Sequence, residues 1–277
     1  MGRGQIPPSG PPFAEHPCGG APCGAFVGSG AVFLNAGFAS YLLCDLNADL
    51  IGLYRTLRRD GERFMRRRGP VHAGQHTQEA FLRLRETFNA SSDAEERSVL
   101  FLYLNRHSYN GLVRYNSKGI YNVPFGKYKA PYFPERELTA FLDKLRGCDV
   151  AFAVQDFRST FAALRPGDVV YCDPPYAPVS ATANFTSYTG GGFGVQEQID
   201  LASEASAAAK RGVPVVREQP RCALSASFMP MPGWNRSRCS GSSVATARGA
   251  GPRANFWRCS HDYGAGRRHC QQAGQYP

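Results

Sequence analysis

The chain has 277 residues, 43% of them hydrophobic, and a formal net charge of +10, which fits a soluble α/β domain with an inserted lobe or two small domains. No apolar run approaches the roughly 18–20 residues that a membrane-spanning helix needs, and the N-terminal residues lack the apolar stretch of a secretory signal, so we expect a cytoplasmic protein without membrane contact. The nine cysteines show no paired CxxC spacing, which argues against a zinc or other metal site.

The first elements form a strand–helix–strand pattern. Residues 26–34 (FVGSGAVFL) predict a strand, a glycine-rich turn and the start of a helix. Residues 41–45 (YLLCD) predict a second strand that ends in a carboxylate. Cys44 in this strand, like Cys172 further along, lies in an apolar run where a reduced, buried thiol is the usual outcome.

A long helical region follows. Residues 47–145 have a mainly helical pattern, and Ser92 with Glu95 three residues later approximates a capping box, which predicts a helix start near Ser92. Within this region residues 105–133 break the periodicity with Asn, Gly and Pro. We therefore predict a long hairpin or loop on a helical lobe.

The alternation of strands and helices then resumes. The pattern predicts strands near 150–155 and 168–172, a helix near 195–210 and a strand at 213–216. This order predicts an α/β fold: a Rossmann-like sheet of parallel strands, formed by residues 26–46 and 146–216, with residues 47–145 inserted as a helical lobe.

Residues 217–277 differ from the rest of the chain. They hold nine Arg against one Glu and one Asp, which is +7 of the total +10, so a nucleic-acid interface in residues 1–216 must be argued from individual basic positions. They contain no Ile, and Leu224 and Val244 are the single Leu and Val. Such composition offers too little aliphatic surface to offset the entropy of ordering, and it predicts a disordered tail.

Residues 170–176 (VYCDPPY) combine a buried strand with a carboxylate, two rigid residues and an aromatic ring at its C-terminal end, where open α/β sheets bind ligands. Asp173 and a backbone carbonyl of the proline turn can accept the two hydrogens of an exocyclic amine such as N6 of adenine, which frees its lone pair to attack a methyl sulfonium. Tyr176 would stack on an extruded base, and the prolines would fix the acceptors. Without further context, Asp-Pro-Pro-Tyr would be equally consistent with an ordinary turn after a strand.

Two other segments give this motif its context. Phe26-Val27-Gly28-Ser29-Gly30 follows the pattern of a glycine turn under a nucleotide-like ligand, and Asp45 ends the next strand where it can accept from ribose hydroxyls. Asp156-Phe157 can supply an acceptor and an apolar wall for an adenine ring. For Asp156, a purely structural role at the end of the strand is nearly as well supported.

The predicted hairpin interleaves basic and aromatic side chains, a mixture typical of surfaces that contact phosphates and base edges together. Arg114 could recognise guanine, Leu112 or Pro124 could meet a thymine methyl, and Tyr109 could wedge between bases. The alternative is a solvated basic loop whose aromatic rings face the lobe. The basic and aromatic residues of this set are Arg106, Arg114, Lys118, Lys127, Lys129, Tyr109, Tyr115, Tyr121, Phe125 and Tyr128.

The sequence resembles the DNA adenine methyltransferases that act at GATC. The resemblance covers roughly residues 26–216 and is carried by NRHSYNGLVRYN, YNVPFGKYKAPYFPE and VVYCDPPYAPVSATANFT. It implies S-adenosylmethionine as cofactor and double-stranded DNA as partner. It implies that Asp173, Pro174, Pro175 and Tyr176 are catalytic; that Phe26, Gly28, Gly30, Asp45, Asp156, Phe157 and Asp173 lie at the cofactor; and that Tyr109, Asn110, Leu112, Arg114, Asn122, Pro124, Lys127 and Tyr128 face DNA. Lys127 departs from the family's usual Arg, and its point charge suits a phosphate better than a base edge.

The ends do not match this family, and a change of reading frame would explain why. Members begin with Trp-Ala-Gly-Gly-Lys at the cofactor; residues 1–8 can be encoded so that the same bases, taken one position later, give that segment. Residues 217–223 can similarly give Val-Ser-Asn-His-Asp-Ala-Leu, close to the family's continuation. We therefore predict that residues 1–25 and 217–277 are out of frame, that the tail is irregular, and that the strand at 213–216 is left as an exposed edge.

The resulting prediction is a monomeric enzyme that methylates adenine N6 in duplex DNA, at GATC, after flipping the base. Two alternatives stay open. One is an inactive product of a frame-damaged gene. The other is a related N-methyltransferase acting on cytosine, RNA or a protein amide, although relatives of that kind commonly carry Ser or Asn in place of Asp173.

Overall fold

A computed structural model describes residues 21–72, 76–129, 131, 133–175, 193–220, 234–239, 242–247, 257–259 and 270–272. The elements are β1 (Pro22–Gly24), α1 (Ala31–Asn35), β2 (Ser40–Asp45), α2 (Ala48–His72), α3 (Gln78–Ala90), α4 (Ala94–His107), η1 (Tyr109–Gly111), α5 (Glu135–Arg146), β3 (Asp149–Val154), α6 (Phe157–Ala162), β4 (Val169–Cys172), α7 (Val195–Lys210), β5 (Val215–Pro220), β6 (Trp234–Cys239), β7 (Ser242–Ala247), β8 (Trp257–Cys259) and β9 (Cys270–Gln272). Among these helices, none is long and apolar enough to cross a bilayer.

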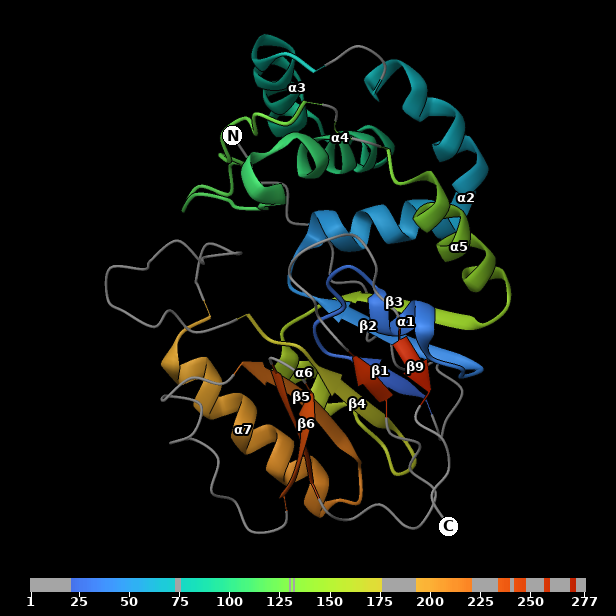
Figure 1. The fold of residues 1–277 in the computed structure, drawn as a ribbon, viewed down its shortest axis with the longest axis vertical. Coiled ribbons are helices and arrows are strands. Elements are labelled where there is room, and N and C mark those ends of the chain that lie inside the picture. The colour runs from blue at the N-terminus through green and yellow to red at the C-terminus, as the bar shows by residue number, and fades with distance from the viewer. Residues whose placement is uncertain are drawn as a thin grey trace, which may run out of the picture.

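The main sheet has the strand order β3-β2-β1-β4-β5-β7-β6. The first five strands pair in parallel, and β7 and β6 add to the β5 edge in antiparallel orientation. Helices α2 to α5 lie in the chain between β2 and β3, and Figure 1 shows them as a lobe above the sheet. The prediction of an α/β fold with a parallel sheet and an inserted helical lobe is confirmed.

The parallel strands bury both of their faces. In β2, Tyr41 and Leu43 belong to the core cluster shared with the helical lobe, whereas Leu42 and Cys44 belong to the cluster shared with α6 and α7. This alternation follows from the two-residue period of a strand. Burial raises the pKa of the Cys44 thiol to about 12, and Cys172 behaves alike, so the predicted reduced, buried thiols are found at both positions.

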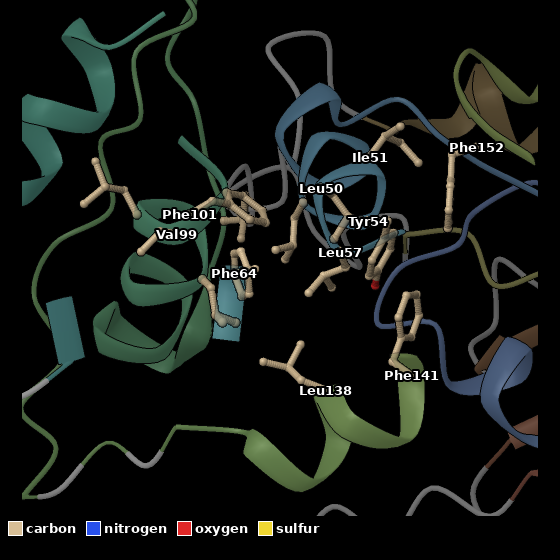
Figure 2. Packing of buried hydrophobic residues seen from close by; sticks show 14 of the residues in the cluster. Leu50, Ile51, Tyr54, Leu57, Phe64, Val99, Phe101, Leu138, Phe141 and Phe152 are labelled. Carbon is tan, nitrogen blue, oxygen red and sulfur yellow. The ribbon is translucent and has the colours of Figure 1, made fainter. Parts of the chain in front are cut away.

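Helix α2 joins the lobe to the sheet. The Tyr54 ring stacks on Phe141 of α5, with ring centroids 4.8 Å apart, and on Phe152 of β3 at 5.8 Å. Further along α2, Leu57 and Phe64 join the buried cluster that includes α4, as Figure 2 shows. Because α2 belongs to both packing units, the lobe is continuous with the sheet through one hydrophobic core.

Helix α4 begins near Ser92, as the sequence predicted, although its N-cap lies one position further along the chain. Its N-cap is Asp93, not Ser92, and Asp93 Oδ1 accepts a hydrogen bond of 2.7 Å from the Glu96 amide. The neighbouring Ser91 hydroxyl bonds the Glu96 carboxylate instead. A carboxylate at the N-cap also complements the partial positive charge of a helix N-terminus, which explains why Asp93 is preferred.

The N-terminal strand is β1 at Pro22–Gly24, so the prediction of a strand within 26–34 was wrong in position. β1 lies between β2 and β4, with Cys23 opposite Leu42 and Val170. Small residues suit this central place, since Cys23 and Ala25 are both buried. Part of the segment predicted to be out of frame therefore supplies a central strand of the sheet.

The prediction of an irregular tail was wrong for the ranges that the structure describes beyond residue 217. β6 and β7 form a hairpin, and β7 pairs with β5 from Val216 to Pro220. The expected exposed edge at 213–216 is thus covered. The amides and carbonyls at the edge of β5 are a template for another strand, which favours this pairing.

Candidate active site and nucleic-acid interface

The glycine turn after β1 has the backbone that its sequence predicts. Gly28 and Gly30 have φ angles of 50° and 73°, in the left-handed region that favours glycine. The turn is fixed from two sides: the Gly28 amide donates to Asp45 Oδ2 at 3.2 Å, and the Tyr54 hydroxyl donates to the Gly28 carbonyl at 2.6 Å. A Cβ on Gly30 would approach the Phe141 ring to 3.0 Å, so a larger residue there would also have to displace this ring.

Asp45 ends β2 beside this turn, as predicted. Its Oδ1 accepts from the Asn47 amide at 2.9 Å while Oδ2 accepts from Gly28. Burial raises the pKa of the Asp45 carboxyl, and these two amide hydrogen bonds oppose the rise. Each carboxylate oxygen keeps further acceptor capacity, so Asp45 can still accept from ligand hydroxyls.

Three phenylalanine rings meet near the glycine turn. Phe26 stacks on Phe157 with centroids 5.8 Å apart and an interplanar angle of 28°. Phe193 packs edge-on against both, at 5.6 Å and 6.0 Å. The predicted site residues Phe26 and Phe157 are therefore in contact, and Phe193 is an additional member that sequence reasoning missed. In the sequence, Phe193 could have been noticed as the single aromatic residue in the run Gly190-Gly191-Gly192-Phe193-Gly194.

Asp156 caps α6 in this structure. Its Oδ1 accepts from the Arg158 amide at 2.8 Å, and its carboxylate forms an ion pair with Arg158 Nη1 at 3.2 Å. Arg158 also pairs with Asp200 of α7. Asp156 therefore has a structural role as the N-cap of α6, which was one of the two roles considered from the sequence. A contact of Asp156 with the cofactor stays a prediction.

Asp173 follows directly after β4. Asp173 is half-buried and Pro174 is buried, while the Pro175 carbonyl accepts a hydrogen bond of 3.2 Å from Gln198 Nε2. Because β4 is parallel to its neighbour β1, this turn and the glycine turn lie at the same edge of the sheet. We call Gly28, Gly30, Asp45 and 173–175 the carboxyl-edge site. Tyr176, the fourth residue of the predicted motif, lies outside the described residues.

The predicted hairpin is present on the lobe. Isolated bridges join Ser108 to Phe125 and Tyr115 to Tyr121. Tyr115 and Tyr121 face inward: Tyr121 is 1% exposed, and the Tyr115 hydroxyl donates to Asp49 Oδ2 at 2.6 Å. Phe125 packs on Phe81. For these three rings the alternative interpretation, aromatics turned into the lobe, was correct.

The remaining predicted interface residues lie on the outer side of the hairpin. Asn110 has a left-handed backbone, with φ 52°, and turns the chain at η1. Arg114 is half-buried and held by Asn122: its Nε donates to Asn122 Oδ1 at 2.9 Å, and its Nη2 donates to the Asn122 carbonyl at 3.3 Å. The exposed members are Tyr109, Asn110, Leu112, Pro124, Lys127 and Tyr128.

Comparison with known proteins identifies the family. Residues 22–227 match the model of the D12 class N6 adenine-specific DNA methyltransferases. The chain belongs to this family. It is 49% identical over 178 residues to the DNA adenine methylase of Serratia marcescens, covering 64% of this chain and 65% of that protein. It is 47% identical over 193 residues to the DNA adenine methylase of Vibrio cholerae serotype O1, covering 69% of each chain. For the DNA adenine methylase of Escherichia coli K12 the identity is 45% over 192 residues, covering 69% and 68%.

In this D12 family member, the match spans slightly less than two thirds of the Serratia protein. The matched range begins at Pro22, where β1 begins, and includes the whole carboxyl-edge site and the hairpin. It also extends past residue 217, into the segment predicted to be out of frame. β1 and β5 therefore both lie within the matched range.

Proposed function

We propose that this chain is a site-specific DNA methyltransferase that transfers a methyl group from S-adenosylmethionine to N6 of adenine in duplex DNA, at GATC. The observation that carries this proposal is the position of Asp173-Pro174-Pro175. In a chain of the D12 family, this turn ends β4 beside the Gly28–Asp45 turn at one edge of the sheet.

The residues beside the glycine turn suit S-adenosylmethionine. Asp45 would accept hydrogen bonds from its ribose hydroxyls, and the ring cluster of Phe26, Phe157 and Phe193 would cover its adenine. A Cβ at Gly28 would meet no atom of the described residues within 4 Å, so the backbone there leaves room for a close ligand. The cofactor supplies an electrophilic methyl group on a sulfonium.

The chain's own contribution to the reaction is to hold the nucleophile. The Asp173 carboxylate accepts one hydrogen of the adenine N6 amine, and we assign the other to the Pro174 carbonyl, which follows it directly in the chain, while the Pro175 carbonyl accepts from Gln198. With both hydrogens held, the nitrogen lone pair is directed toward the methyl group. The rigid φ of two consecutive prolines keeps the two acceptors in place.

The hairpin would recognise the target sequence. Arg114, held by Asn122, presents a fork of donors that matches O6 and N7 of guanine. Leu112 is 42% exposed and would meet a thymine methyl, and Tyr109, at 53%, would fill the gap left by the flipped adenine. Lys127 and Tyr128 would contact the phosphate backbone. We propose that the chain acts as a monomer on DNA, without membrane contact.

One observation favours the alternative of a frame-damaged, inactive product. Arg217, the first residue of the predicted out-of-frame tail, is 1% exposed within the sheet, and its buried Nε has no hydrogen-bond partner among the residues that the structure describes. A frame one base later can place Val there. A strand of this sheet ordinarily carries an aliphatic residue at such a position.

Transfer of a labelled methyl group to short duplexes tests the proposal. The purified chain is incubated with methyl-labelled S-adenosylmethionine and a duplex that contains one GATC site, and a second duplex differs only by replacement of the guanine. Label in the first duplex and at least tenfold less in the second, about the effect of losing one bidentate base contact, would support the proposal. No label in either duplex would favour the inactive alternative.

A further inference from the structure

Gln198, in the first turns of α7, connects this helix to the turn at the carboxyl-edge site. It is 7% exposed, and its Nε2 donates to the Pro175 carbonyl at 3.2 Å. Its Oε1 accepts from Nη2 of Arg217, on β5. Chemistry fixes the amide orientation, because a carbonyl can only accept and a guanidinium can only donate.

The start of α7 is itself held in place. The Glu197 carboxylate accepts from the Gly194 amide at 2.8 Å, which caps the helix. Leu201, Ala205 and Ala208 on the same helix are buried in the core cluster shared with β4 and β5. Gln198 therefore projects from a fixed backbone, and its contact with Pro175 is not an incidental contact of a mobile side chain.

The Pro174–Pro175 segment needs an anchor of this kind. Neither proline has an amide hydrogen, so the turn cannot donate backbone hydrogen bonds to its surroundings. Its carbonyls are what remain to tie it to the rest of the fold. The hydrogen bond from Gln198 fixes the Pro175 carbonyl, and through the rigid rings it fixes the Pro174 carbonyl next to it.

We propose that Gln198 is a positioning residue for the methyl transfer: it holds the Pro174–Pro175 turn so that the Asp173 carboxylate and the Pro174 carbonyl keep their spacing around the target amine. This inference rests on the proposed function. Gln198 does not touch the substrate in this account, and its effect passes through the Pro175 carbonyl.

The variant Gln198→Glu separates this role from a merely structural one. Glutamate keeps an acceptor for Arg217, which becomes an ion pair, so the fold retains its partner at that end. An ionised carboxylate has no hydrogen to donate to Pro175. Gln196→Glu is the matched control: it makes the same change at an exposed side chain two residues away on the same helix, where it removes a hydrogen bond to Asp200 and none to the proline turn.

In single-turnover methylation at saturating DNA and cofactor, we expect Gln198→Glu to lower the rate about tenfold to hundredfold, the scale of a small misplacement of reacting groups. The concentrations of DNA and cofactor that give half the maximal rate should stay near those of the unchanged chain. A variant that matches Gln196→Glu in rate at neutral pH would overturn the inference.

A second measurement does not depend on turnover. The sequence contains Pro-Tyr at 131–132 and 175–176, so labelling proline carbonyls with ¹³C and tyrosine amides with ¹⁵N gives two correlated carbonyl signals. In Gln198→Glu the Pro175 carbonyl signal should move to lower frequency while the Pro131 signal stays in place. An unmoved Pro175 signal would overturn the inference. If the unchanged chain transfers no methyl group, the proposed function fails, and this signal still decides whether Gln198 holds the turn.

Discussion

The carboxyl-edge site and the hairpin hold their side chains in different ways. At the carboxyl-edge site the groups are tied to the backbone: Asp45 accepts two amide hydrogen bonds, and a proline turn follows the buried end of β4. On the hairpin, Tyr109, Leu112 and Lys127 are exposed, with inward-facing rings beneath them. Substitutions at the sheet edge should therefore cause large losses of methylation rate, whereas substitutions on the hairpin should cause smaller changes in the affinity for particular DNA sequences.

The largest effect is expected for Asp173→Ala. The carboxylate acts on the extruded base, so its removal should lower the single-turnover methylation rate at least a hundredfold, within the range found for removing a preorganised transition-state contact. Binding to a GATC duplex, measured by fluorescence anisotropy, should change less than about threefold. Near-normal turnover would remove Asp173 from the mechanism.

Arg217→Val tests the other end of the sheet. Arg217 is buried and burial lowers its pKa; its Nη2 donates to Gln198 Oε1, while its Nε has no hydrogen-bond partner among the described residues. Valine at this position should raise the free energy of unfolding by about 1 kcal/mol, because removal of a buried guanidinium with an unsatisfied Nε outweighs the loss of its hydrogen bond to Gln198 Oε1. Urea unfolding measures the change. A destabilised variant would show that Arg217 belongs in the sheet.

On the hairpin, Arg114→Ala should reduce discrimination at the guanine by about 1–3 kcal/mol, the scale of a bidentate base contact. The measurement compares affinities for a GATC duplex and a duplex with that guanine replaced. The matched variant Lys127→Ala should weaken binding to both duplexes alike and reduce the salt dependence of affinity. Equal losses on both duplexes for Arg114→Ala would contradict base recognition by this residue.

The smallest effect concerns pH and the base of the hairpin. His107 Nδ1 donates to the Tyr103 carbonyl at 2.8 Å, so in the neutral ring Nε2 accepts from His76 Nδ1 at 3.0 Å. Burial is the main cause that lowers the pKa of His107. A lowered folded-state pKa means that His107 contributes stability above its unfolded pKa of about 6.5, and that this stability is lost as the pH falls through the folded-state value.

His107→Gln should therefore lose less stability than the unchanged chain when the pH falls from about 7 to about 5. Thermal unfolding at a series of pH values gives the comparison, with the exposed His76→Gln as a control for the partner ring. Parallel pH profiles for His107→Gln and the unchanged chain would contradict this assignment.

The carboxylates at strand ends could be located from the sequence, because the carboxyl ends of all parallel strands lie at the same edge of the sheet. Asp45 and Asp173 were found in this way. β1 was misplaced because Pro22, Cys23 and Gly24 have no strand preference of their own, and neighbours on both sides make them a strand. Phe193 and Gln198 were missed because their roles depend on where α7 packs, which local patterns do not encode.

The hairpin shows the same limit in another form. Its residue types indicated a nucleic-acid interface, but an irregular turn has no fixed period from which to tell inward from outward rings. Tyr115 and Tyr121 were therefore grouped with Tyr109, although a buried hydroxyl contact to Asp49 holds Tyr115 in the lobe. Packing, not composition, distinguishes the inward-facing rings from the outward-facing ones.

The most direct test of the account is the identity of the methylated base. The purified chain is incubated with S-adenosylmethionine and a duplex containing GATC, the DNA is digested to nucleosides, and these are analysed by mass spectrometry. The account predicts N6-methyldeoxyadenosine with the unchanged chain and none with Asp173→Ala. N4-methyldeoxycytidine, or no methylated nucleoside with a folded chain, would contradict it.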